Sequence, residues 1–273
     1  MTSLKNRTIV MSGGSRGIGL AILVAAARQG ANAVLLAKTD HPDPRLPGTV
    51  HSAVEQIETA GGEAVAVVGD VRAEDDVARA VATAVDRFGG VDIVINNASA
   101  LNLSGTLDLT PKRYDLMQQI NAKGAFQLSR AALPHLFASD DPQIVSLSPP
   151  INLAPRWLGR FPAYTLSKYG MTLLTLGFAA EFAERGVRAN CLWPQTTIAT
   201  AAVVNLLGGR DAASRARRPE IMADAAVALL SDPARPSGEV FLDVEALARA
   251  GVRDLSGYGG TDDPELDFFV DEL

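Results

Sequence analysis

Short apolar runs recur along the chain and alternate with longer segments of helical spacing. Seven runs of mostly aliphatic residues predict strands near 8–11, 33–37, 64–68, 91–95, 144–147, 187–193 and 240–244. The segments between them repeat apolar positions every three to four residues and predict helices over 17–29, 50–60, 74–88, 111–136, 163–185 and 219–231. This alternation is typical of βαβ units, so we expect one doubly wound α/β domain with a mainly parallel, seven-stranded sheet.

Two segments do not fit this alternation. Residues 41–48 hold three prolines and follow the second predicted strand, and residues 149–162 hold four prolines and follow the fifth. Proline fixes its φ angle and has no N–H to donate, so we expect both segments to be irregular loops. Because ligands bind beyond the carboxyl ends of the strands in open α/β sheets, we expect both loops at the functional edge.

Composition and charge narrow the class of protein. The 273 residues are 47% hydrophobic and 21% charged with a net charge of −6, a globular balance without the basic surface that favours nucleic acid. One cysteine, Cys191, and three scattered histidines exclude an internal disulfide and argue against a metal site. No apolar run is long enough for a signal peptide or a membrane span, so we expect a cytoplasmic protein.

The acidic segment 261–273 carries the apolar residues Phe268, Phe269 and Val270. An acidic composition is typical of a frayed end, whereas aromatic rings favour docking on a neighbouring subunit. The sequence leaves both interpretations open.

The first predicted strand runs into a glycine-rich turn, residues 12–19 (SGGSRGIG), and then directly into a helix. Gly13, Gly17 and Gly19 would let a pyrophosphate approach the backbone, and the helix N-terminus offers free amides and partial positive charge. The strand before and the helix after favour a nucleotide site over a merely structural turn. The spacing is not GxGxxG, so the motif alone does not indicate an ordinary dinucleotide-binding dehydrogenase.

Two cations near this turn bear on which nucleotide it would bind. Lys38 follows the second strand where NAD sites usually place an acid, and Arg16 lies within the turn. Both would suit a 2′-phosphate, so NADP(H) is favoured over NAD(H), although both could be solvated surface charges. Asp70, at the end of the third strand, could accept a hydrogen bond from the adenine amino group or cap the next helix.

Tyr164 and Lys168 are four residues apart in a predicted helix and therefore project from one face. A nearby ammonium favours the phenolate, which predicts a lowered pKa for Tyr164 and a group able to transfer a proton near neutral pH. Such a pair occurs often by chance, as a packed tyrosine beside a surface lysine. It becomes persuasive only together with the glycine turn upstream.

Four motifs together resemble the short-chain dehydrogenase/reductase family. They are the glycine turn, residues 96–99 (NNAS), Asn121 in the long helix, and residues 164–168 (YTLSK), in matching order and spacing over about residues 7–195. Residues 37–49, 148–150 (SPP) and 193–196 (WPQT) are similar to the hydroxysteroid dehydrogenase-like protein 2 group of that family. The resemblance implies a single Rossmann-type catalytic domain over 1–273, with a cofactor-binding part near 7–195, a substrate loop near 196–218, and a C-terminal strand and tail at 237–273.

The resemblance also implies a role for each motif. Tyr164 would donate or accept a proton, Lys168 would bond the nicotinamide ribose, and Asn121 would support a water that links Lys168 to solvent. For Asn121 and Asn96 the alternative is a buried amide that braces the backbone, which is favoured for Asn96. The implied cofactor contacts are Gly13, Ser15, Arg16, Gly17, Ile18, Gly19, Lys38, Asp70, Val71, Asn97, Ala98, Tyr164, Lys168 and Pro194.

Several positions depart from the family pattern near the substrate. Ser148 matches the first of two serines after the fifth strand, but Pro149 occupies the place of the second, which usually polarises the carbonyl. Ser148 would therefore complete the catalytic set only through an altered loop. Proline donates no hydrogen bond, and losing one such donor costs about 2.7–4 kcal/mol of transition-state stabilisation. Ser99 and Gln195 replace glycines at the nicotinamide edge.

The leading hypothesis is an NADP(H)-dependent oxidoreductase that interconverts a hydrophobic ketone or aldehyde and its alcohol. Residues 151–161 and 196–217 would contact the substrate, and the helices at 111–136 and 163–185 would form a homodimer or homotetramer. The alternative is a low-turnover NADP(H)-binding scaffold or redox sensor, which Pro149 motivates. A third hypothesis is a nucleotide-binding transferase, such as a methyltransferase.

Overall fold

Seven strands, each parallel to its neighbours, form one sheet in the computed structural model, which describes residues 3–43, 47–206, 213–261 and 264–271. They are β1 (Thr8–Ser12), β2 (Asn32–Ala37), β3 (Ala64–Val68), β4 (Ile93–Asn96), β5 (Gln143–Ser146), β6 (Arg188–Trp193) and β7 (Val240–Leu242). Their order across the sheet is β3-β2-β1-β4-β5-β6-β7. The predicted doubly wound α/β domain of the Rossmann type is confirmed.

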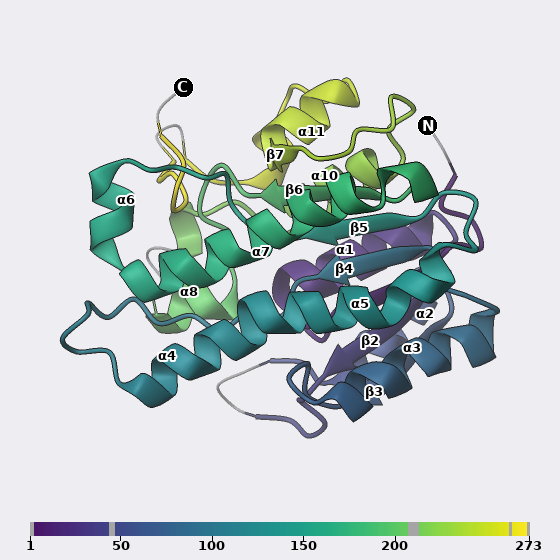
Figure 1. Ribbon diagram of the computed structural model, residues 1–273. Coiled ribbons are helices and arrows are strands. Elements are labelled where there is room, and N and C mark those ends of the chain that lie inside the picture. The colour runs from purple at the N-terminus through teal and green to yellow at the C-terminus, as the bar shows by residue number, and fades with distance from the viewer. Residues whose placement is uncertain (1–2, 44–46, 207–212, 262–263, 272–273) are drawn as a thin grey trace.

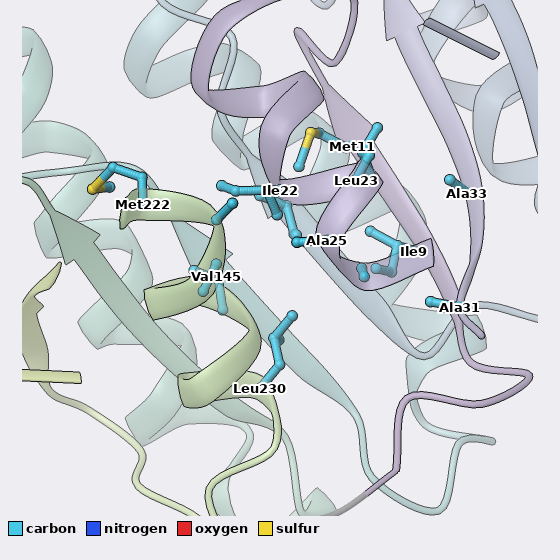
Figure 2. Packing of buried hydrophobic residues seen from close by; sticks show 14 of the residues in the cluster. Ile9, Met11, Ile22, Leu23, Ala25, Ala31, Ala33, Val145, Met222 and Leu230 are labelled. Atoms are coloured by element: carbon cyan, nitrogen blue, oxygen red, sulfur yellow. The ribbon is translucent and has the colours of Figure 1, made fainter. Parts of the chain in front are cut away.

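Helices cover both faces of the sheet (Figure 1). One face carries α1 (Gly17–Arg28), α2 (Val50–Thr59), α10 (Glu220–Leu230) and α11 (Asp243–Arg249), and the other carries α3 (Glu74–Phe88), α5 (Gly124–Leu136) and α7 (Pro162–Glu181). Successive side chains of β1 alternate between two apolar layers, so Ile9 packs into the first and Val10 into the second. Figure 2 shows Ile9 in the first layer with Ile22 of α1 and Leu230 of α10. None of the helices in the described ranges has both the length and the apolar character needed to cross a membrane.

The two longest predicted helices are present with interruptions. The helix expected over 111–136 consists of α4 (Pro111–Gln118), a π-helical turn η1 (Gln119–Lys123) and α5 in unbroken succession. The helix expected over 163–185 is α7 followed by a 3-10 turn, η2 (Ala183–Arg185). Hydrophobic periodicity does not predict the π turn because a turn of five residues is too short to show a period of its own. Such turns are frequent at functional sites.

The expectation of an irregular loop over 149–162 is wrong in part, because this segment contains the short helix α6 (Pro155–Arg160). Pro155 lies at the start of α6, where a missing N–H removes no helical hydrogen bond. In the segment 41–48, residues 44–46 lie outside the described residues, and the described remainder forms neither helix nor strand. The short elements α8 (Ala201–Leu206), α11 and η3 (Ser256–Tyr258) span too few residues to show a period.

A third cluster of buried side chains lies beyond the carboxyl ends of β6 and β7. It joins α6 and the start of α7 to residues 264–271, which pack on their own chain beside α6 (Figure 1). Neither interpretation of the acidic end matches this arrangement, because Phe269 and Val270 are buried within the same molecule. The cluster comprises Met117, Trp157, Phe161, Tyr164, Tyr169, Trp193, Leu242, Phe269 and Val270.

Candidate active site

A crevice of about 1070 Å³ lies beyond the carboxyl ends of β1, β2, β3 and β4. It is centred where the strand order reverses between β1 and β4, the position at which doubly wound sheets bind ligands. Tyr164, Lys168 and Pro194 do not line it. Eleven of the predicted cofactor residues do: Gly13, Ser15, Arg16, Gly17, Ile18, Gly19, Lys38, Asp70, Val71, Asn97 and Ala98.

The glycine turn leaves a cradle that side chains would fill. Gly13 has a φ of +77° and Gly17 a φ of +55°, a left-handed region that favours glycine. A Cβ on Gly19 would lie 2.5 Å from the Asn97 side-chain nitrogen, and that nitrogen donates a hydrogen bond to the Gly13 carbonyl at 2.8 Å. Asn97 therefore clamps the turn to the end of β4. Since α1 begins at Gly17, its first free amides face this cradle, which fits a pyrophosphate.

The two predicted cations both lie at the edge of this crevice. Arg16 donates hydrogen bonds to the carbonyls of Pro47 (3.1 Å) and Gly48 (3.0 Å), so it ties the proline-rich loop to the glycine turn. The Lys38 ammonium lies 3.2 Å from an Asp70 carboxylate oxygen, and the Lys38 side chain is 58% exposed. Both cations are thus placed where the adenosine end of a nucleotide would lie.

Asp70 does not cap the following helix. Its carboxylate accepts hydrogen bonds from the Arg72 backbone N–H and from the Arg72 guanidinium, and the N-cap of α3 is Ala73. Those bonds hold the pKa of Asp70 well below its usual range. Asp70 is therefore a fixed, ionised acceptor at the crevice, and the helix-cap alternative is wrong.

Tyr164 and Lys168 lie one turn apart near the start of α7. The Lys168 ammonium donates to the Leu147 carbonyl at 2.9 Å and lies 5.1 Å from the centroid of the Trp193 ring. Burial lowers the pKa of Lys168 to about 8, and the nearby Asp267 carboxyl acts in the opposite direction. The lysine is thus a buried cation anchored to the strand end after β5.

The predicted lowering of the Tyr164 pKa is wrong for this conformation. Burial raises the pKa of Tyr164, and the negative charge of Asp267 raises it further. The phenol is 5% exposed and lies under the ring of Phe269, while the Lys168 ammonium donates to the Leu147 carbonyl. Exclusion of water disfavours the phenolate more than the ammonium favours it.

The two asparagines brace the structure around the pair. The Asn121 side chain, in the π turn, accepts from the Ala100 N–H (2.7 Å) and donates to the Ala100 carbonyl (3.0 Å) and to Ser167 Oγ (2.9 Å). It fastens the segment after β4 to α7, which matches the bracing alternative. Asn96 donates to the hydroxyls of Ser129 (3.0 Å) and Ser146 (3.2 Å), as expected for a buried amide.

Ser148 is not brought to Tyr164 by any hydrogen bond. It is fully buried, and its hydroxyl finds no partner by geometry in the part of the chain that the structure describes. It lies beside the Cys191 thiol, whose pKa burial raises to about 11. The next carbonyl, of Pro149, accepts a hydrogen bond from Thr172 Oγ1 at 2.7 Å. The segment after β5 is thereby attached to α7, and the Ser148 side chain remains buried.

Two carboxyl groups near the pair were not predicted from the sequence. Asp243, at the start of α11, accepts a hydrogen bond from the Gln195 N–H at 2.9 Å, and burial raises its pKa to about 6. Asp267 donates its own N–H to the Gln195 carbonyl at 2.9 Å, and burial raises the pKa of its carboxyl to about 7. The apolar residues Phe268 and Phe269 within an acidic segment were the one signal in the sequence that pointed to this region.

Solved structures of the same fold contain nicotinamide nucleotides of both kinds. Carveol dehydrogenase from Mycobacterium avium, in complex with NAD, is 21% identical with a TM-score of 0.76 over 89% of this chain and 97% of its own. L-Sorbose reductase from Gluconobacter frateurii, with NADPH and L-sorbose, is 24% identical with a TM-score of 0.76 over 88% and 96%. At these identities the likeness shows the fold alone.

Closer relatives show the family. The short chain dehydrogenase family model matches residues 7–207. Hydroxysteroid dehydrogenase-like protein 2 of Danio rerio is 46% identical over 97% of this chain, which spans 64% of that relative's length. A putative dehydrogenase from Xanthomonas campestris is 51% identical, with a TM-score of 0.94 over the whole of both chains. The chain therefore belongs to the short-chain dehydrogenase/reductase family of NAD(P)-dependent oxidoreductases.

Proposed function

We propose that the chain interconverts a hydrophobic ketone or aldehyde and its alcohol with NADP(H), and that Tyr164 transfers the proton. This proposal rests on the contacts that connect the crevice to the Tyr164–Lys168 pair. Ile120 lines the crevice, the adjacent Asn121 donates to Ser167 Oγ, and Lys168 follows in α7. A nucleotide in the crevice would therefore reach the first turns of α7.

The nicotinamide ring, when bound, would supply or accept the hydride. The chain itself would handle the proton: the Tyr164 hydroxyl would give it to the carbonyl oxygen in reduction and take it from the alcohol in oxidation. Lys168 would hold the nicotinamide ribose, and Pro194, directly after β6, would border the nicotinamide edge. Asn121 would act indirectly, because it braces the segment after β4 against α7.

Lys38 and Arg16 support NADP(H) over NAD(H). The pair between Lys38 and Asp70 is solvent-screened, so a 2′-phosphate could take the place of the carboxylate at little cost. Lys38→Asp should weaken NADPH binding by about 10–100-fold, the value of one charge-assisted hydrogen bond. Fluorescence titration with NADPH and NADH measures this, and Lys112→Asp on α4, outside the crevice, is the matched control. If Lys38→Asp lost affinity for NADPH and for NADH by the same factor, the result would contradict a preference for NADP(H).

The surroundings of Tyr164 support a hydrophobic substrate. Trp157, Phe161 and Trp193 share its buried cluster, and Leu153 and Leu158 are exposed on the neighbouring segment. Residues 151–161 and 196–217 are the proposed substrate segments, of which 207–212 lie outside the described residues. We expect kcat/KM to rise with the length of the apolar chain of a ketone series.

We also propose a homodimer or homotetramer built on α4, α5 and α7. These helices expose the apolar side chains of Leu116, Phe126, Leu166 and Leu173, a surface typical of association. Analytical ultracentrifugation would test it, and a monomer at micromolar concentration would contradict it. The free Cys191 supports a reducing compartment such as the cytoplasm.

The test of the reaction follows NADPH absorbance with a panel of hydrophobic ketones, with Tyr164→Phe in parallel. Turnover that vanishes in the variant would support the proposal. A second candidate, a nucleotide-binding protein of low turnover, is favoured by the inward hydroxyl of Ser148 and by Pro149. Tight NADPH binding without turnover across the panel would favour that candidate. Family membership argues against the transferase hypothesis.

A further inference from the structure

Residues 264–271, called the strap below, are fastened to their own chain along their length. The partners of the strap lie in β6, in the segment after it and in α6, so the contacts join regions far apart in sequence. Two backbone bonds join the strap to the segment after β6, from the Thr197 N–H to the Glu265 carbonyl (3.0 Å) and from the Asp267 N–H to the Gln195 carbonyl (2.9 Å). Two indoles also donate to the strap: Trp193 Nε1 to the Phe268 carbonyl (2.9 Å) and Trp157 Nε1 to the Asp271 carboxylate (2.8 Å).

Phe269 anchors the strap. It is 1% exposed, and its φ of +70° lies in the left-handed region that bulky residues rarely adopt. Such a conformation persists only where packing holds it. The docked position is therefore specified by the fold. The rings whose centroids lie 5.1–6.3 Å from that of Phe269 belong to Trp157, Phe161, Tyr164, Tyr169 and Trp193.

The strap covers the proposed proton donor. The ring of Phe269 stacks on Tyr164 with centroids 6.2 Å apart and planes at 26°, and Phe268 meets Tyr164 edge-on at 6.3 Å. The strap thus covers the ring of Tyr164, and its movement would widen the path of a substrate carbonyl to the hydroxyl.

The strap also brings a carboxyl group to the catalytic pair. Asp267 interacts electrostatically with Lys168 and Tyr164 of α7 and with Asp243 of α11. Gln195 fixes this arrangement, because its carbonyl accepts from the Asp267 N–H and its own N–H donates to the Asp243 carboxylate. A negative charge here favours the charged form of Lys168 and disfavours the phenolate of Tyr164.

We propose that the strap is a lid over the catalytic pair of its own chain, and that Asp267 is a positioning residue that the docked strap presents to Lys168. The inference rests on the proposed roles of Tyr164 and Lys168. Closure then excludes water and at the same time provides the counter-charge that keeps the buried ammonium protonated. Among the described residues, four further groups face this set. Glu265 lies on the strap, Arg217 faces Asp243, Cys191 faces Lys168, and Arg160 lies over the Phe268 ring.

The first test titrates the lysines directly and needs no turnover. The chain has five lysines, so protein labelled with ¹³C-lysine gives few ¹³Cε signals, and Lys168→Met identifies that of Lys168. The expected midpoint of about 8 should fall by about one pH unit in Asp267→Asn, because a neighbouring opposite charge is lost. Glu265→Gln, which removes an exposed charge from the same strap, should shift it much less. Tryptophan emission would show that the strap stays docked, since both indoles bond to it.

The second test measures the pH dependence of kcat/KM for ketone reduction. Loss of the Asp267 charge lowers the pKa of Lys168, so the fall in rate at high pH that accompanies deprotonation of this lysine should move to lower pH in Asp267→Asn and equally in Asp267→Ser. A role limited to packing would change the rate without moving the profile. An unmoved Lys168 midpoint with the strap docked would overturn the proposal. Absence of turnover in the wild type would instead overturn the proposed function, and the lysine titration would still decide the role of Asp267.

Discussion

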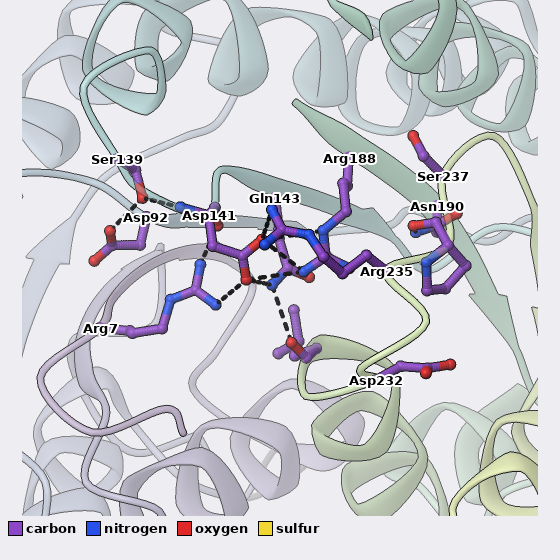
Figure 3. A network of polar contacts seen from close by, with 12 residues as sticks. Arg7, Asp92, Ser139, Asp141, Gln143, Arg188, Asn190, Asp232, Arg235 and Ser237 are labelled. Carbon is purple, nitrogen blue, oxygen red and sulfur yellow. Dashed lines mark hydrogen bonds and ion pairs between the residues drawn. The ribbon is translucent and has the colours of Figure 1, made fainter. Parts of the chain in front are cut away.

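The two ends of the sheet bury charge in opposite ways. At the amino ends of the strands, Asp141 lies between three arginines, with nitrogen–oxygen distances of 2.9 Å to Arg7, Arg188 and Arg235 (Figure 3). Gln143 adds a hydrogen bond at 3.0 Å to the same carboxylate. Both oxygens of this buried acid are therefore engaged by partners from four separate segments.

At the carboxyl ends, buried polar groups keep unused hydrogen-bonding capacity. The hydroxyls of Ser148 and Thr196 and one carboxylate oxygen of Asp243 make no hydrogen bond within the described residues. Lys168 donates to a single backbone carbonyl and has a weak sulfur contact to Met171. Unsatisfied buried groups are costly, so a fold keeps them chiefly where a ligand or water completes them.

This difference in hydrogen bonding indicates that the buried polar groups at the amino ends of the strands stabilise the fold, whereas those at the carboxyl ends serve function. A network with engaged partners holds the first, fifth and sixth strand regions together but has little capacity for a substrate. Ser148, Thr196 and Asp243 lie at the carboxyl ends of the strands, where the reaction is proposed. In the Asp141 network, Nη1 of Arg188 is the one buried side-chain atom without a partner among the described residues. The comparison predicts that removing a buried charge at the amino ends of the strands lowers only the free energy of unfolding. Removing one at the carboxyl ends should lower only turnover.

Lys168→Met should give the largest effect on turnover and a small effect on folding. Loss of the cation beside the proposed acid should lower kcat/KM by about 10²–10⁴-fold. The variant loses one hydrogen bond to the Leu147 carbonyl but no longer buries a charge, so its free energy of unfolding should change by about 1 kcal/mol or less. Steady-state kinetics and urea unfolding measure the two quantities. A strongly destabilised Lys168→Met would break the proposed separation.

Asp141→Ala should show the reverse pattern. Removal of this carboxylate leaves Arg7 and Arg188 buried without their main partner, which should cost about 3–5 kcal/mol of unfolding free energy. Binding of NADPH to the folded variant should be unchanged, because no residue of this network lines the crevice. Asp86→Ala, at an exposed carboxylate on α3, is the control and should unfold like the wild type. A weakened nucleotide affinity in Asp141→Ala would show that the two ends are coupled.

The sequence predicted the crevice because its motifs are local. The glycine turn and the strand ends at Lys38 and Asp70 each follow directly from a predicted strand, so the strand order alone brings them together. The Arg7–Asp141 pair joins positions 134 residues apart, and no local pattern marks either residue. The position of the strap depends on packing of Phe269 among rings from three other segments, which hydrophobic periodicity does not describe.

The smallest predicted effect is a pH dependence of strap docking. The docked strap raises the pKa of Asp267 from 3.8 to about 7, so docking takes up a proton and weakens as pH rises between these values. Docking should therefore be weakest above about pH 7, where the Asp267 carboxyl is charged whether the strap is docked or not.

Acrylamide quenching of the two tryptophans measures this dependence, because Trp157 and Trp193 both donate hydrogen bonds to the strap. Quenching should be greatest above about pH 7 and should decline as the pH falls below this value, because the protonated Asp267 carboxyl favours docking. In Asp267→Asn this decline on the acid side should disappear. Quenching that is flat from about pH 4 to 8 in the wild type would mean that docking of the strap is not linked to the charge of Asp267, and it would contradict this prediction.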